Sequence, residues 1–180
     1  PGFQDAHTFL EVGTGHGLYA IAACQVHQSL KATVCTTPEN IDLLQKNISL
    51  YGMEDRITVC SDLPGSITGD AAYSIILASH MLYPYQDRLT DVISNFAALL
   101  APGGLFLSNH WFIHESEGTG SQGLYELELA MHSRYHAIHD QDEFEKICRE
   151  SGLYMFQTGV MRSGFGESTI HMASNKKEEN

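Results

Sequence analysis

The sequence predicts a doubly wound α/β domain with a mostly parallel sheet, and three observations support this prediction. Short apolar or β-branched runs alternate with longer segments of helical period, which is the pattern of consecutive β-α units. A glycine-rich turn over residues 13–17 joins the first such run to the first helical segment. The length of 180 residues, with 43% apolar composition, suits one domain in which helices cover a sheet.

The first half of the chain alternates strands and helices. Its expected strands are β-branched or apolar runs, and the run at 72–78 is apolar enough for a central strand buried on both faces. Its second helix begins with Thr37 as N-cap and Pro38 in the first helical position, and Gly52 ends it. In order, the expected elements are a strand at 7–12, a helix at 18–26, a strand at 32–35, the Pro38 helix, and strands at 56–60 and 72–78.

In the second half, a helix with one apolar stripe begins after Pro84 and ends at the Pro-Gly-Gly of residues 102–104. The glycine- and serine-rich residues 115–123 predict a surface loop. Asp140 is a candidate N-cap for the last helix. The remaining expected elements are a strand at 105–108, helices at 124–136 and 140–151, and a hairpin of strands at 153–160 and 168–173.

Charge and cysteine content restrict the partners and the compartment. Ten Lys and Arg against 22 Asp and Glu give a formal net charge of −12, which disfavours nucleic acid as a partner. The four cysteines are far apart in apolar runs and predict neither a metal knuckle nor a dense disulfide scaffold, which favours a reducing, cytoplasmic location. No apolar stretch reaches the roughly 20 residues of a membrane helix, so no membrane partner is expected.

The most informative motif is the run E-V-G-T-G-H-G over residues 11–17. Its glycines permit positive φ and allow a ligand to lie against bare backbone at a helix N-terminus. A dinucleotide fold would place its third glycine three positions after the second, whereas the spacing here is G-x-G-x-G. Glu11 would repel a phosphate and attract a cationic amino group, which favours S-adenosylmethionine. The alternative is a glycine turn that only closes a β-α unit.

The chain resembles the class I S-adenosylmethionine-dependent methyltransferases, and within them the small-molecule O-methyltransferases of the caffeic acid and acetylserotonin type. The resemblance extends over essentially the whole chain and is carried by the following segments: FLEVGTGHGLYAIAA, KATVCTTPENI, YGMEDRITVCSDLP, SIILASHMLYPY, LLAPGGLFLSN and DEFEKICRESGL.

This resemblance implies a seven-stranded sheet that ends in an antiparallel hairpin, with the cofactor held over the carboxyl ends of the first strands. Residues 1–174 are then an S-adenosylmethionine-binding methyltransferase domain, and residues 175–180 are a disordered tail. The amino-terminal dimerisation domain of the family is absent from this chain, and a homodimer is expected of the full-length protein.

The expected cofactor-binding residues are Glu11, Gly13, Gly15, Gly17, Thr36, Asp62 and Leu63. Asp62 matches the acid that, in the family, accepts a hydrogen bond from the adenine amino group. Thr36 stands where the family has an acid that binds the ribose hydroxyls, and its hydroxyl should bind ribose more weakly than a carboxylate does.

His80 is the candidate general base, because methyl transfer to a phenol or enol needs a deprotonated acceptor oxygen. It follows an apolar strand and matches the catalytic histidine of the family. The Asp and Trp that usually follow are here Met81 and Leu82, and the acid that usually orients the histidine is His110. The alternative is a histidine that only packs or caps at this position.

Aromatic residues after two strand ends suggest a flat acceptor, and the helix at 124–136 is expected to lie over the acceptor pocket. The expected acceptor-binding residues are Tyr83, His110, Trp111, Met131 and Tyr135, and no metal is expected.

The sequence therefore predicts an S-adenosylmethionine-dependent methyltransferase that methylates a hydroxyl of a small aromatic or polyketide-like molecule. Two alternatives stay open. One is a methyltransferase that works by proximity without a general base. The other is a non-catalytic or degenerate cofactor-binding module.

Overall fold

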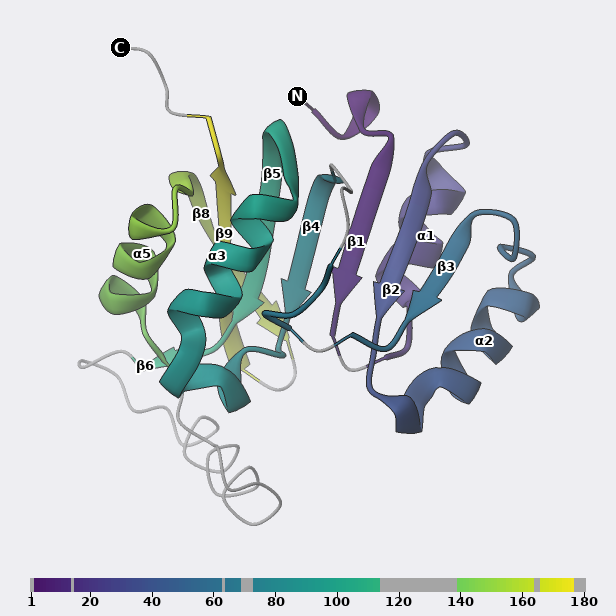
Figure 1. The fold of residues 1–180 in the computed structure, drawn as a ribbon, viewed down its shortest axis with the longest axis horizontal. Helices are drawn as coiled ribbons and strands as arrows, with labels where there is room; N and C mark the ends of the chain where they lie inside the picture. The colour runs from purple at the N-terminus through teal and green to yellow at the C-terminus, as the bar shows by residue number, and fades with distance from the viewer. Residues whose placement is uncertain are drawn as a thin grey trace.

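Seven strands form one sheet in the order β3-β2-β1-β4-β5-β9-β8 (Figure 1). The computed structural model describes residues 2–13, 15–62, 64–68, 73–113, 139–163 and 166–176. The neighbours from β3 to β5 pair in parallel, and β9 pairs antiparallel with both β5 and β8. The strands are β1 (Thr8–Val12), β2 (Lys31–Cys35), β3 (Ile57–Cys60), β4 (Tyr73–Ser79), β5 (Leu100–His110), β8 (Tyr154–Ser163) and β9 (Gly166–Ser174). The predicted fold class and the terminal hairpin are confirmed.

Helices cover both faces of the sheet, and each face has its own hydrophobic cluster. On one face, side chains of α1 and α2 pack with Phe9 and Val34. On the other face, side chains of α3 and α5 pack with Leu10 and Ile76. The helices are α1 (Leu18–Val26), α2 (Ile41–Leu50), α3 (Leu89–Leu99) and α5 (Gln141–Glu150), with short 3-10 helices η1 (Phe3–Asp5), η2 (Pro38–Asn40) and η3 (Tyr83–Arg88).

The carboxyl ends of the parallel strands meet at one edge, where the arrowheads of β1 to β4 lie together (Figure 1). In the register, Val12 at the end of β1 pairs with Cys35 of β2 and with Ala78 of β4, and Cys35 pairs with Cys60 of β3. Ligands of open parallel sheets bind at this edge. The glycine turn and His80 both follow strands that end here.

The structure corrects the expected strand at 105–108. β5 already begins at Leu100 and runs through the Pro-Gly-Gly of residues 102–104, because Leu100 pairs with Tyr73 across a register shift in the ladder. A side chain at Gly104 would lie 2.9 Å from the carbonyl oxygens of Tyr73 and Ala101. The glycines therefore let the chain re-enter the sheet rather than only ending the helix before it.

Other elements differ from the prediction in detail. The short parallel pair β6 (Phe112–Ile113) and β7 (His139–Asp140) has no signal in the sequence pattern, because two-residue strands show no periodicity. The expected loop at 115–123 and helix at 124–136 lie outside the described residues.

Cys35 and Cys60 form a disulfide across β2 and β3, with a Cα–Cα distance of 4.6 Å. The sequence predicts no dense disulfide scaffold, and it did not identify this one pair. The two residues are 25 apart in the sequence but adjacent in the sheet register, a relation that only the strand pairing reveals. Cys24 and Cys148 are free and buried.

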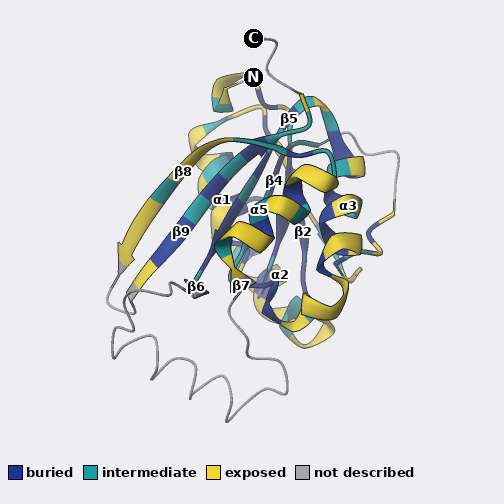
Figure 2. Ribbon diagram, turned by 90° about the vertical axis from the view of Figure 1, so that its left-hand side faces the viewer, coloured by how far each residue is buried: buried dark blue, intermediate teal, exposed yellow. Residues whose placement is uncertain are grey.

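Burial is highest in the central strands, whereas β8 and the outward faces of α3 and α5 are exposed (Figure 2). β8 forms one edge of the sheet and carries exposed apolar side chains at Phe156, Val160 and Met161. Among the described residues, no helix combines the length and the apolar character that crossing a membrane requires.

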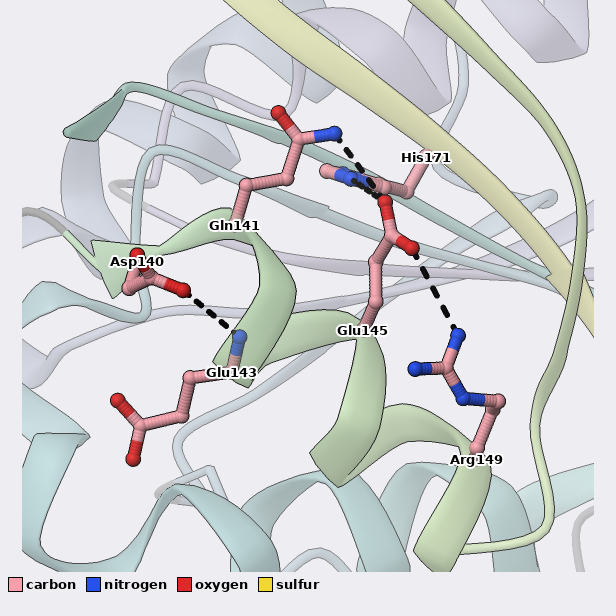
Figure 3. A network of polar contacts seen from close by, with 6 residues as sticks. All are labelled: Asp140, Gln141, Glu143, Glu145, Arg149 and His171. Carbon is pink, nitrogen blue, oxygen red and sulfur yellow. Dashed lines mark hydrogen bonds and ion pairs between the residues drawn. The ribbon is translucent and has the colours of Figure 1, made fainter. Parts of the chain in front are cut away.

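A polar network joins α5 to β9 (Figure 3). Oε1 of Glu145 accepts a hydrogen bond from Nε2 of Gln141 at 3.1 Å and lies 3.4 Å from Nε2 of the buried His171. Arg149 lies 3.7 Å from the other oxygen of Glu145. Burial lowers the pKa of His171, and the nearby Glu145 charge opposes that shift.

Asp140 is the N-cap of α5, as the sequence predicts, and its carboxylate accepts the Glu143 N–H at 2.9 Å. Asp140→Ala is expected to lower the free energy of unfolding by about 1 kcal/mol, because that N–H loses its partner. Urea denaturation measures the effect. Asp142→Ala, on the same first turn without a cap bond, is the matched control and should change stability by less than about half as much. Equal losses in both variants would contradict the capping role.

Candidate active site

The glycine turn brings bare backbone to the carboxyl edge of β1. Gly15 has φ of 95°, and Gly17, the N-cap of α1, has φ of 66°. A Cβ at Gly15 would collide with Thr36 Oγ1 and with the Asn40 side chain. A Cβ at Gly17 would collide with Leu44. Both positions therefore require glycine for conformation and for space.

Gly15→Ala is expected to weaken binding of S-adenosylhomocysteine about tenfold or more, because the turn must shift to relieve both the φ strain and the contacts. Gly52→Ala is the matched control, since Gly52 has φ of 63° but nothing within 4 Å of its added Cβ. Calorimetric titration measures the ligand affinity of both variants, and a thermal melt measures their stability. Similar losses of affinity in both would show that positive φ alone, and not the crowded turn, determines the result.

A cavity of about 540 Å³ opens beside this turn. It brings together three of the expected site elements, namely Glu11, the turn glycines Gly13 and Gly15, and His80. Its other walls come from the first turns of α1 and from the end of β4: Leu18, Tyr19, Ala22 and Ser79. A ligand that lies in the cavity would contact both the glycine turn and His80.

Glu11 lies in this cavity with only 6% of its surface exposed. Its Oε2 accepts the N–H of Ala20 in the first turn of α1 at 2.7 Å. Burial raises the pKa of Glu11 to about 7, and the hydrogen bond from Ala20 opposes the shift. A cation in the cavity would favour the ionised carboxylate, so the site has an acid that gains charge when such a ligand binds.

Thr36 and Asp62 follow the ends of β2 and β3 and are not among the residues that line the cavity. Thr36 is 5% exposed, and its Oγ1 is buried without a hydrogen-bond partner among the described residues. A ligand hydroxyl would supply the partner that this buried oxygen lacks. Asp62 is exposed and follows the end of β3 after one residue, and Leu63 lies outside the described residues.

His80 is held from three sides. It is the one non-glycine residue with positive φ, 49°, among the described residues, and its N–H donates to the Asn109 carbonyl at 2.9 Å. Its Nδ1 lies 2.9 Å from the Tyr83 hydroxyl, and its Nε2 lies 3.3 Å from Nδ2 of Asn109. With the Asn109 amide donating, Nδ1 carries the proton and Nε2 is the lone-pair atom.

Burial lowers the pKa of His80 to about 4. The ring is therefore neutral at physiological pH and has a lone pair available to accept a proton, although it is a weak base. No carboxylate of the described residues is hydrogen bonded to it. Among the described residues, the groups that bond to the ring and could stabilise an imidazolium are neutral.

His110, expected to take the place of the orienting acid, does not bond to His80. It is fully buried, and its Nε2 accepts the backbone N–H groups of Met81 and Leu82 at 3.3 Å each. Its ring centroid is 6.1 Å from that of His80. His110 therefore supports the turn after His80, while the neighbouring Asn109 contacts the histidine itself.

Tyr83 and Trp111 stack with His80 rather than forming open walls. The ring centroids of His80 and Trp111 are 4.0 Å apart, and the Tyr83 and Trp111 rings are 15° from parallel at 6.3 Å. Tyr83 is 4% exposed, and its hydroxyl accepts a hydrogen bond from the backbone N–H of Trp111 at 2.8 Å. The partly exposed Trp111 thus remains the aromatic face nearest His80. The expected acceptor residues Met131 and Tyr135 lie outside the described residues.

Sequence reasoning missed Asn109 and Ser79, which border His80. Both lie at carboxyl ends of parallel strands, where ligand sites of α/β folds open, so strand position alone is the signal that could have found them. It also missed Leu18 and Tyr19, which line the cavity although they are apolar helix residues. Among the described residues, no three potential metal ligands gather at one place.

The sheet order, the glycine turn and the cavity at the carboxyl edge define a cofactor-binding α/β domain. The family of methyltransferase domains matches residues 2–158, and the chain belongs to this family.

Known proteins extend this comparison. The ribosomal protein L11 methyltransferase of Trichlorobacter lovleyi is 33% identical over 95 residues, which are 53% of this chain and 29% of that protein. An O-methyltransferase family protein from Burkholderia thailandensis superposes with a TM-score of 0.84 at 19% identity, over 98% of this chain and 53% of that one.

Two further structures have the same fold. The mitomycin 7-O-methyltransferase MmcR has a TM-score of 0.81 at 18% identity, over 97% of this chain and 50% of its own. PigF, solved with S-adenosylhomocysteine (SAH), has a TM-score of 0.77 at 21% identity, over 97% of this chain and 52% of its own. The chain thus spans about half the length of these structures and less than a third of the curated relative.

Proposed function

We propose that this chain is the catalytic domain of an S-adenosylmethionine-dependent methyltransferase that methylates a hydroxyl of a small aromatic or polyketide-like molecule. The observation that carries the proposal is the single cavity that joins the glycine turn, Glu11 and His80. PigF was solved with S-adenosylhomocysteine, and MmcR is named for O-methylation of a small natural product, which supports the same cofactor and acceptor class here.

The residues present fit the cofactor. The glycine turn would accept its amino-acid part against bare backbone, and Glu11 would pair with its cationic amino group. The Thr36 hydroxyl, which has no partner among the described residues, and the exposed Asp62 carboxylate follow the next two strand ends, and we expect them to bind ribose and adenine. When bound, S-adenosylmethionine supplies an electrophilic methyl group on a sulfonium.

The protein's own step is the handling of the acceptor proton. The acceptor hydroxyl would displace the Asn109 amide from Nε2 of His80 and donate its proton there, while Nδ1–H stays bonded to the Tyr83 hydroxyl. Because His80 is a weak base, the site favours acceptors with acidic hydroxyls, such as enols and electron-poor phenols.

One observation favours a second candidate, methyl transfer by proximity without a base. Both nitrogens of His80 are already bonded within the protein, so an acceptor that is an anion at neutral pH needs nothing from this side chain. A degenerate, non-catalytic module is the remaining alternative. It predicts no measurable affinity for the cofactor.

The test is calorimetric titration with S-adenosylmethionine and S-adenosylhomocysteine, followed by a turnover assay on a panel of simple phenols and enolic β-diketones. Micromolar binding with turnover on the panel supports the proposal. Absence of binding to both ligands overturns it, and turnover only on a protein acceptor would overturn the small-molecule assignment.

A homodimer of the full-length protein and a cytoplasmic location are part of the same proposal. In a reducing compartment the Cys35–Cys60 disulfide would form and open with the redox state rather than persist as a permanent link.

A further inference from the structure

The Cys35–Cys60 disulfide lies beneath the proposed nucleoside site. Cys35 and Cys60 are the last residues of β2 and β3 and are partners in the sheet register. Thr36 follows the first cysteine directly, and Asp62 follows the second after one residue. The disulfide therefore joins the two strand ends from which the expected ribose and adenine contacts project.

Backbone hydrogen bonds connect the same pair to the glycine turn. The Gly13 N–H donates to the carbonyl of Cys35 at 3.3 Å. The Thr36 N–H donates to the carbonyl of Cys60 at 3.0 Å. A change in the position of either cysteine is thus transmitted to the turn and to the Thr36 hydroxyl, which has no partner within the described residues.

The two cysteines of the disulfide differ in their exposure. Cys35 is 2% exposed and packs in the core, whereas Cys60 is partly exposed at the outer strand β3. A thiolate from solution would therefore attack the Cys60 sulfur. The free cysteines Cys24 and Cys148 are fully buried, and burial raises the pKa of both thiols, so they do not compete in exchange.

We propose that Cys35 and Cys60 form a redox-sensitive modification site that couples thiol–disulfide exchange to cofactor affinity, a proposal that rests on the proposed function. A dithiol reductant opens the disulfide in two steps. Its first thiolate bonds to the Cys60 sulfur, the Cys60–Cys35 bond breaks, and Cys35 leaves as a thiolate. The second thiol of the reductant then displaces Cys60, so two electrons and two protons pass from the dithiol to the protein.

The oxidised form is the tighter binder of the nucleoside. The covalent link restricts the two strand ends, so Thr36 and Asp62 lose less conformational freedom when a ligand orders them. Reduction leaves the strand ladder in place but releases these ends. The expected result is SAH binding about fivefold weaker in the reduced protein, restored when a disulfide oxidant closes the pair again.

The experiment titrates the full chain with S-adenosylhomocysteine after treatment with dithiothreitol or with glutathione disulfide. Alkylation under denaturing conditions and mass spectrometry count the free thiols in each sample. Two labels on the oxidised protein and four on the reduced protein are expected, since the chain has four cysteines and one disulfide.

A double variant, Cys35→Ser with Cys60→Ser, should bind like the reduced protein and should not respond to either treatment. Cys24→Ala with Cys148→Ala is the matched control and should respond as the wild type does. Four labels after oxidation would overturn the site itself. A change in affinity smaller than twofold, or tighter binding after reduction, would overturn the coupling while leaving the proposed function intact. Absence of binding in both redox states would instead be the failure of the proposed function.

Discussion

Replacing His80 by asparagine is expected to lower the rate of methyl transfer about 100-fold, while the affinity for SAH stays within about threefold. Asparagine tolerates the positive φ of 49° at this position, so the substitution removes the imidazole without adding backbone strain. His7→Asn, at the exposed amino-terminal end of β1, is the matched control and should keep full activity.

The pH dependence gives a second measurement of the same role. Burial lowers the pKa of His80 to about 4, so the base is already neutral from about pH 5 upward. The turnover rate at saturating cofactor should therefore not fall between pH 8 and pH 6, where an ordinary histidine would begin to protonate. A rate in the Asn variant within threefold of the wild type would instead assign the reaction to proximity alone.

Replacing Glu11 by glutamine is expected to weaken SAH binding about 30-fold at pH 8. Glutamine keeps an acceptor for the Ala20 N–H but removes the charge that pairs with the ligand's amino group. In the wild type, affinity should fall as pH drops through about 7, because burial raises the pKa of Glu11 to that value and protonation removes the attraction. The variant should show no such dependence. Glu54→Gln, exposed and remote, is the matched control.

Glu11→Gln is also expected to raise the free energy of unfolding of the unliganded protein, although it weakens ligand binding. The folded state binds a proton at Glu11 more tightly than the unfolded state does, so this group makes the protein less stable as pH rises from about 4.5 to about 7. Above pH 7 the cost is up to about 3 kcal/mol, and Glu11→Gln removes it. Urea denaturation at pH 8 measures this gain. A variant that binds normally, or that is less stable than the wild type, would contradict the role of Glu11.

The sequence pattern was sufficient to predict the sheet and the glycine turn. Alternation of apolar runs and helices is a property of neighbouring residues, and the glycine spacing with Glu11 is contained in seven consecutive positions. Glu11, Gly13, Gly15 and His80 line one cavity. The roles of these residues stay predictions that the variants above test.

The surroundings of His80 could not be predicted in the same way. Asn109 and His110 are adjacent, and only the direction in which each side chain leaves β5 decides which one contacts His80. The prediction chose His110 from the family pattern, whereas the ladder turns Asn109 toward the histidine. The disulfide was missed for a related reason, since Cys35 and Cys60 become neighbours through the register of β2 and β3 and not through their spacing.

Because side chains alternate along β1, the packing of its apolar residues also fixes the position of the Glu11 carboxylate. Phe9 packs on the α1 side of the sheet and Leu10 on the opposite side, and Glu11 follows on the α1 side, where it meets the Ala20 N–H. A slip of β1 by a single position would turn the carboxylate to the wrong face and expose Phe9 and Leu10 to mismatched neighbours. The packing that prevents β1 from slipping therefore also keeps the Glu11 carboxylate at the position where a bound cation would lie.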